Sequence, residues 1–283
     1  MRELARIQFR GDAKDFISAW NTQSTLQIEQ RVVALYKDEP DYAQMSELFA
    51  NFTQQHAMTW FERVEIEYSE QELLSFDLLV LHIVGQAGMG NNALAPVYTV
   101  KPICDTCGRV EYNQTHNLVL NLLEGQDDPL ETGYFQHDIC ETDFHEVVVS
   151  QKIKALFEQN QVKGIGLRTI EHISDMVVAN PYYQLLVEPQ IGALVGPSPI
   201  RRLDPCETCG QYKQVLLGVL AGTRESEFYF SKSSYVGDWI MKTTDRFGRV
   251  PNFSSKIVIS QQLYRLLKEH NITGFWVQPA HLV

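Results

Sequence analysis

With 283 residues, 44% of them hydrophobic, the chain is long enough for one large or two modest domains, and no apolar run approaches the roughly 18 residues of a membrane-spanning helix. Its 24 basic against 35 acidic residues give a net charge of −11, and no Lys/Arg cluster exceeds Arg201-Arg202, which disfavours binding to DNA or RNA. The same balance favours a basic protein partner, and the lack of an apolar signal segment after Met1 predicts a soluble, cytoplasmic protein that does not bind membranes.

Residues 1–100 are predicted to form a helical N-terminal segment followed by the first strands. The alternating apolar residues of Val64–Tyr68 predict a strand. Ser69 and Glu72 then form a capping box for a short helix, before a second apolar strand at Leu78–Val84. Three stretches further upstream are expected to be helical: Asp12–Trp20, Gln27–Leu35 and Tyr42–Phe52.

One five-residue pattern, Cys-x-Thr-Cys-Gly, occurs twice, at Cys104–Gly108 and Cys206–Gly210. A C-x-x-C turn brings both sulfurs to one point, and the following glycine lets backbone N–H groups approach them, which is typical of a metal knuckle. We therefore divide the rest of the chain into a first CxxCG repeat at 101–180, a bridge or linker at 181–205 that is rich in Pro and Gly, and a second CxxCG repeat at 206–283.

The duplication extends beyond the knuckles. Val147–Ile153 is matched by Ile257–Leu263, and each copy predicts a buried strand, a short helix capped by Ser150 or Ser260, and another strand, which can form a parallel crossover within one sheet. The knuckle and the capping serine are 46 positions apart in the first copy and 54 in the second. The second copy therefore carries 8 extra residues, which we expect in a loop around Asp245–Ser255.

Together these elements predict an α+β fold. It contains two tandem, related, β-rich repeats, each with a zinc-knuckle turn and a short strand-helix-strand unit, preceded by the helical N-terminal segment.

The ligand inventory favours one metal ion shared by both knuckles. No His or Cys lies between Cys209 and His270, so the second pair has no local third and fourth ligand of the kinds that zinc prefers. Disulfides and redox pairs are disfavoured, because five cysteines are spread over 283 residues and nothing requires two redox motifs. We therefore expect one closed, structural zinc site without an open position for substrate, with four ligands: Cys104, Cys107, Cys206 and Cys209.

The chain resembles the double-CXXCG immunity proteins of bacterial polymorphic-toxin systems. The resemblance covers residues 60 to 283 and depends on the two Cys-x-x-Cys-Gly motifs and on the terminal pattern Lys256–Ser260 and Ile272–Phe275. One departure is that 103 residues precede the first knuckle, whereas the family members place theirs close to the start. The N-terminal part is therefore an addition with its own role, such as contacting a toxin.

The resemblance implies a function by stoichiometric binding. An immunity protein of this family would bind a cognate protein toxin and block its active site, while zinc stiffens the scaffold and no residue is catalytic. Rhs-type and type VI secretion proteins are one implied source of the toxin, and NAD-using ADP-ribosyltransferases are one implied target class.

Two alternatives remain open. A hydrolase that reverses a toxin modification could use His137, Asp138, Asp143 and His145, although these acids also align with Asp238 and Asp245 as repeated turn residues. Gly85–Gly90 is weak as a phosphate loop, because no Lys follows the glycines. The second alternative is a zinc-ribbon adaptor that binds nucleic acid, which the acidic composition disfavours.

Overall fold

The computed structural model describes most of the chain, namely residues 1–11, 13–24, 26, 28, 31–53, 58–87, 97–120, 136–142, 144–172, 181–196, 198, 200–217 and 227–283. It divides into two compact units. The first contains Met1–Leu73, and the second contains Leu74–Leu217 and Glu227–Val283. None of the helices in these ranges combines the length and the hydrophobicity needed to cross a bilayer.

The predicted α+β fold class with a helical N-terminal segment is wrong. Of the described residues, 49% lie in strands and 22% in helices, and one of the sheets is a curled half-barrel. The N-terminal segment is not mainly helical, because apolar and polar residues alternate in Ala5–Arg10 as they do in a strand. The run around Val33 is also short enough to fit either a helix or a strand.

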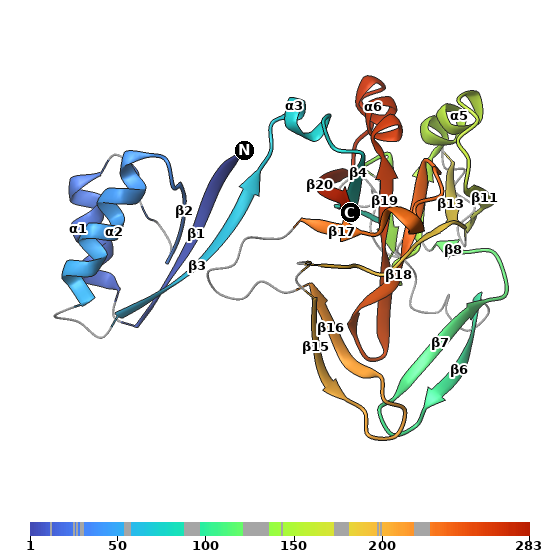
Figure 1. Ribbon diagram of the computed structural model, residues 1–283, viewed down its shortest axis with the longest axis horizontal. Coiled ribbons are helices and arrows are strands. Elements are labelled where there is room, and N and C mark those ends of the chain that lie inside the picture. Colours follow the sequence, from blue (N-terminus) through green and yellow to red (C-terminus); the bar gives the residue numbers. More distant parts are fainter. Residues whose placement is uncertain are drawn as a thin grey trace. The chain divides into compact units, whose positions relative to one another are not determined.

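The first unit is a three-stranded antiparallel sheet with two helices. The central strand β1 (Arg2–Gly11) pairs with β2 (Val32–Tyr36) and β3 (Met58–Glu67). The helices α1 (Lys14–Gln23) and α2 (Pro40–Thr53) pack against this sheet (Figure 1) and confirm two of the three predicted helices. The third, Gln27–Leu35, is wrong from Val32 onward, where the chain forms β2. Asp12 and Gln27, where two of these predictions begin, are outside the described residues.

An aromatic and aliphatic core fills the space between this sheet and its helices. Phe9 of β1 lies 4.9 Å from Phe16 of α1, measured between ring centroids, and Trp20 is fully buried with its indole N–H donating to the Leu26 carbonyl at 2.7 Å. The predicted capping box follows β3. Ser69 N donates to the Glu72 carboxylate at 2.8 Å and starts the short helix α3 (Glu70–Leu73).

The second unit contains two copies of one series of elements. The first copy consists of β4 (Leu78–Ile83), β5 (Gly85–Ala87), β6 (Tyr98–Cys104), β7 (Arg109–Gln114), β8 (Val119–Leu120), β9 (Ile139–Thr142), β10 (Val147–Ser150), α5 (Gln151–Gln159), β11 (Ile165–Thr169) and β12 (Glu171–His172). The second consists of β13 (Tyr182–Val187), β14 (Gln190–Ile191), β15 (Ile200–Pro205), β16 (Tyr212–Leu217), β17 (Phe228–Phe230), β18 (Ile240–Arg249), β19 (Asn252–Ser260), α6 (Gln261–Glu269) and β20 (Phe275–Leu282). The segment 181–205, predicted to be a bridge, thus contains three of these strands.

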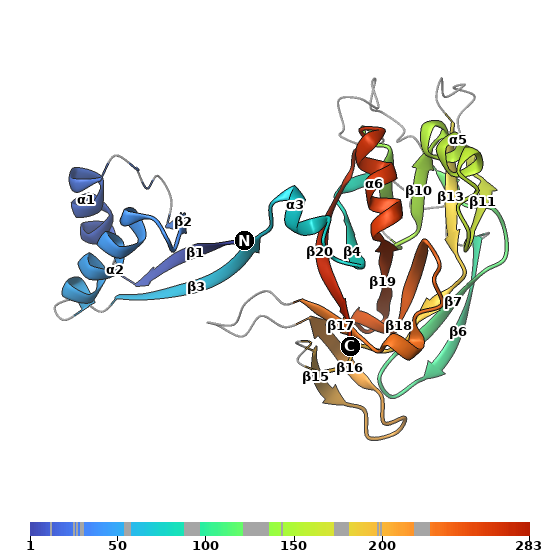
Figure 2. The same cartoon turned by 45° about the horizontal axis from the view of Figure 1, so that its top comes forward.

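The repeated strand-helix-strand unit is confirmed in both copies. The Ser150 side chain accepts a hydrogen bond from Ile153 N at the start of α5, and the Ser260 side chain accepts one from Leu263 N at the start of α6. Within each copy the two strands run parallel in one sheet, because both pair antiparallel with the strand between them. Figures 1 and 2 show α5 and α6 at one end of this unit and the hairpins β6–β7 and β15–β16 at the other.

In both sheets, the strand that separates the two parallel strands of one copy comes from the other copy. One sheet has the order β11-β13-β10-β9-β5, so β13 of the second copy separates two strands of the first. In the eight-stranded sheet β4 of the first copy lies between β19 and β20 of the second. The registers correspond, since Ser150 pairs with Tyr182 and Ser260 with Leu78. The repeats are therefore interlocked by an exchange of strands.

The backbones of the two repeats lie close together at Gly274. Its φ is +95°, and a Cβ atom added there would lie 2.1 Å from the Ile139 carbonyl oxygen. Ile139 N donates to the Thr273 carbonyl at 3.1 Å, and Val84 N donates to the Gly274 carbonyl at 2.9 Å. This junction therefore has room for glycine only.

The extra residues of the second copy lengthen a hairpin. In the first copy, β9 and β10 are 4 residues each, whereas the equivalent strands β18 and β19 have 10 and 9 residues. The expected loop around Asp245–Ser255 is therefore mostly β-structure, because Arg246–Arg249 pairs with Asn252–Ser255 as a continuous ladder. This extension reaches the knuckles and pairs with β16.

Candidate metal centre

The two Cys-x-x-Cys turns meet at the tips of the hairpins β6–β7 and β15–β16. Cys104 Sγ lies 3.8 Å from Cys206 Sγ, and Cys107 Sγ lies 3.9 Å from Cys209 Sγ, and all four sulfurs lie within 4.8 Å of one another. A tetrahedron of thiolates with metal–sulfur distances of about 2.3 Å has sulfur–sulfur distances of about 3.8 Å. The four cysteines are thus positioned to bind one metal ion, as the ligand inventory predicted.

The two turns are related by a local twofold symmetry. Thr208 Oγ1 donates to Thr106 Oγ1 at 2.9 Å, and this pair, like the two cysteine pairs, is separated by 102 residues in the sequence. Gly108 and Gly210 follow with nearly identical φ values of +71° and +69°. This left-handed conformation favours glycine and explains the residue that ends each motif. Each repeat therefore supplies half of the site in the same geometry.

Backbone N–H groups stabilise the negative charge of the buried sulfurs. The N–H groups of Cys209 and Thr208 lower the pKa of Cys206 to about 6, and the N–H of Cys107 lowers the pKa of Cys104. Burial acts in the opposite direction on Cys107 and raises its pKa to about 11. Because metal ligation needs all four thiolates, a bound cation supplies the positive charge that keeps the remaining sulfurs ionised.

The lengthened β18–β19 hairpin contacts both knuckles. Val250 N, at its tip, donates to the Lys213 carbonyl at 3.0 Å, just beyond the second knuckle. Val250 Cγ1 is also the atom nearest to the position that a Cβ atom would take on Gly108, at 3.8 Å. The guanidinium of Arg109 lies 4.8 Å from the centre of the Phe253 ring. The insertion found in the sequence thus braces the metal centre, a role that its length alone did not reveal.

Cys140 is not part of this centre. It is fully buried in β9, and its Sγ donates to the His137 carbonyl at 3.4 Å. Within the described ranges, no other three His, Cys, Asp or Glu side chains come together in the way that the four knuckle cysteines do.

The described residues that could serve a hydrolase, Asp138, His145 and His137, form contacts that stabilise the fold. Asp138 accepts hydrogen bonds from the Ser150 hydroxyl at 2.9 Å and from Thr273 N at 3.1 Å, so its carboxylate links the two repeats. His145 pairs with Glu141 at 3.3 Å, which raises the pKa of His145. The carbonyl of His137 accepts from the Tyr182 hydroxyl at 3.0 Å. Asp143 lies outside the described residues.

The predicted equivalence of Asp138 and Asp238 is shifted by one residue. Ser150 N donates to the Asp138 carbonyl, whereas Ser260 N donates to the carbonyl of Trp239. The Asp138 carboxylate therefore has no copy in the second repeat, because an indole stands in its place.

The glycine-rich segment is explained in part by packing. A Cβ atom at Gly85 would lie 2.3 Å from the Ile139 carbonyl oxygen, so this glycine permits a close approach of two strands. Gly88–Gly90, the last part of the weak phosphate-loop candidate, are not among the described residues.

No model of a known protein family matches the chain, and no curated protein is significantly similar to it in sequence. Functional conclusions therefore depend on the chemistry of the site itself.

Proposed function

We propose that this protein is an immunity protein that binds a cognate antibacterial toxin and blocks its active site, with one structural zinc ion in the four-cysteine centre. The observation that carries the proposal is the closed centre itself. Four thiolates from the two repeats would complete the tetrahedral coordination of a bound ion, which would leave no position for a substrate or an activated water. Such a centre fixes the two knuckles, and with them the interlocked repeats, into a rigid binding scaffold.

Zinc is the metal that this donor set favours. Four soft sulfur ligands in tetrahedral geometry select zinc or iron, and zinc has no redox chemistry that would act on neighbouring groups. The backbone N–H groups that point at Cys206 and Cys104 are typical of a structural thiolate site.

We expect one zinc ion per chain in freshly purified protein. Elemental analysis of protein prepared without added metal should give a zinc-to-protein ratio close to one, and a strong chelator should lower the thermal midpoint as the ion is removed. Two zinc ions per chain, or none in protein that is folded, would contradict a shared site.

A toxin partner is supported by charge and by motif. The net charge of −11 favours a basic surface on the partner, since opposite charges steer association and suppress wrong partners. The paired Cys-x-x-Cys-Gly motifs and the repeated terminal pattern resemble those of double-CXXCG immunity proteins of Rhs and type VI secretion systems. An ADP-ribosyltransferase is the toxin class to examine first.

The test is titration of a toxin domain encoded beside the gene of this protein. We expect a one-to-one complex by size-exclusion chromatography with light scattering, and toxin activity that falls linearly to zero at equimolar protein. Recovery of a modified target at a small fraction of the toxin concentration would instead identify a hydrolase. Retention on nucleic acid that weakens with salt would identify an adaptor.

A further inference from the structure

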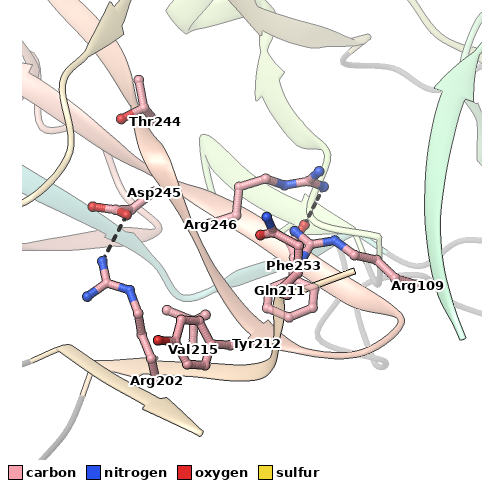
Figure 3. Close-up of a pocket in the computed structure, with 10 residues that line it drawn as sticks. Arg109, Arg202, Gln211, Tyr212, Val215, Thr244, Asp245, Arg246 and Phe253 are labelled. Carbon is pink, nitrogen blue, oxygen red and sulfur yellow. Dashed lines mark hydrogen bonds and ion pairs between the residues drawn. The ribbon is translucent and has the colours of Figure 1, made fainter. Parts of the chain in front are cut away.

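A pocket lined by arginines lies next to the metal centre. Its volume is about 290 Å³, and its wall includes Gly210, which ends the second knuckle, and the following residue Gln211. Figure 3 shows three arginine side chains at this pocket, Arg109 from β7, Arg202 from β15 and Arg246 from β18. Among the described residues that line the pocket, Asp245 has the single carboxylate. In a chain with a net charge of −11, this is a local excess of positive charge.

The carboxylate in the pocket is already engaged. Asp245 Oδ2 accepts from Leu194 N at 2.7 Å, and Asp245 Oδ1 lies 3.5 Å from a terminal nitrogen of Arg202. The charges of Asp245 and Arg202 therefore offset each other, and the positive excess belongs to the other two arginines.

Arg109 and Arg246 converge on Phe253 from two strands. Arg246 Nη2 donates to the Phe253 carbonyl at 2.8 Å, and the Arg109 guanidinium lies over the Phe253 ring. In the described part of the chain, neither guanidinium forms an ion pair. Burial and the positive charge of Arg109 lower the pKa of Arg246, although Glu111 opposes this. Arg109 is partly buried and Arg246 is exposed, and the two like charges face the same pocket, where an anionic ligand between them would offset their repulsion.

We propose that this pocket binds the phosphate group of a small phosphorylated molecule between Arg109 and Arg246. Guanidinium groups present planar sets of N–H donors that match phosphate oxygens, and Arg246 uses one donor on the Phe253 carbonyl and keeps the others. The volume is near the lower end of small-molecule sites, which begin at about 300 Å³, and it exceeds the space that one phosphate ion needs. The rings of Tyr212 and Phe253 in the wall fit an apolar or aromatic group attached to the phosphate.

A competing explanation is that the arginines only balance the charge of the metal centre. Four thiolates around a divalent cation keep a net negative charge, and Arg109 lies two residues beyond Cys107. The two explanations differ in what an arginine substitution changes. Charge balancing predicts a loss of metal, whereas ligand binding predicts a loss of phosphate affinity with the metal retained.

The test is isothermal titration calorimetry of the intact, metal-loaded chain with inorganic phosphate, phenyl phosphate and benzoate, at an ionic strength held constant with NaCl. We expect phenyl phosphate to bind saturably at one per chain and more tightly than inorganic phosphate. Arg246→Gln and Arg109→Gln should each raise its Kd about tenfold or more, because each removes a charge-assisted contact. Arg201→Gln is the matched control, since Arg201 is exposed on β15 and does not line the pocket.

Metal content, measured on every variant, separates the outcomes. Arg109→Gln provides a second reading if Arg246→Gln does not fold, because Arg246 also holds the Phe253 carbonyl. The proposal is overturned if neither phosphate compound binds saturably, if both Gln variants bind phenyl phosphate as tightly as the parent, or if they lose metal while phosphate affinity is unchanged. Tighter binding of benzoate than of phenyl phosphate would also overturn it, because the pocket would then select a carboxylate.

Discussion

Replacing Cys206 with serine is expected to abolish metal retention and to lower the free energy of unfolding of the second unit by more than about 4 kcal/mol, the range reached when a structural metal is lost. Cys206 is buried, and its sulfur receives two backbone N–H groups and lies 3.8 Å from Cys104 Sγ. A serine hydroxyl does not ionise at neutral pH, so the variant offers three thiolates where a closed site needs four. Elemental analysis and urea unfolding measure the two effects.

Cys140→Ser is the matched control for this substitution. Cys140 is the remaining cysteine and is equally buried, but it lies in β9, outside the metal centre. We expect it to keep a full complement of metal and to show a smaller loss of stability, of about 1–2 kcal/mol, from placing a hydroxyl in the core. If Cys206→Ser kept its metal, or if both variants lost it equally, the four-cysteine centre would be refuted.

Gly274→Ala is expected to destabilise the second unit by about 2–5 kcal/mol. A non-glycine residue in the left-handed region costs about 1–2 kcal/mol, and forcing the Ile139 carbonyl away from the new methyl group adds about 1–3 kcal/mol. The added Cβ would lie only 2.1 Å from that oxygen, which belongs to backbone and cannot rotate away as a side chain could. Chemical denaturation gives the change in the free energy of unfolding.

Gly237→Ala isolates the part of this effect that comes from the backbone conformation. Gly237 has a similar φ of +82°, but a Cβ atom there would meet no atom within 4 Å. It should lose only about 1–2 kcal/mol. Equal losses in the two variants would mean that the contact between the repeats at Gly274 contributes nothing to stability.

The metal centre could be predicted because its signal is local and repeated. Each knuckle is recognisable from two cysteines and a glycine within five residues, and the structure gives that glycine a left-handed conformation. Because no other ligands lie near Cys209 in the sequence, the two pairs were predicted to share one ion. The capping serines were found for the same reason, since Ser150 and Ser260 precede helices of matching apolar spacing.

The exchange of strands could not be predicted from the sequence. The run Leu78–Ile83 indicates a strand buried on both faces, but nothing in it specifies whether its neighbours are Ile257–Ser260 or Val147–Ser150. Pairing between distant strands is decided by the register and packing of the whole sheet. The arginine pocket was missed for a similar reason, because Arg109, Arg202 and Arg246 belong to three separate strands that only the fold brings together.

In the N-terminal unit the helical prediction fails because the apolar residues of β1 repeat every two positions, as in a strand. Ala5, Ile7 and Phe9 are buried while Arg6, Gln8 and Arg10 are exposed, and this alternation, present in the sequence itself, indicates a strand. The helix expected at Gln27–Leu35 failed because Val32–Tyr36, rich in residues that favour strands, joins β1 as an edge strand.

The position of β4 also bears on how the protein is made. Leu78, Leu79 and Val80 are fully buried between β19 and β20, which leave the ribosome much later. Until then β4 is an apolar strand with unpaired edges, the kind of segment that templates aggregation in a nascent chain. We therefore expect translation that stops before Phe275 to yield products that need a chaperone or are degraded, because only the late arrival of β20 covers the second edge of β4.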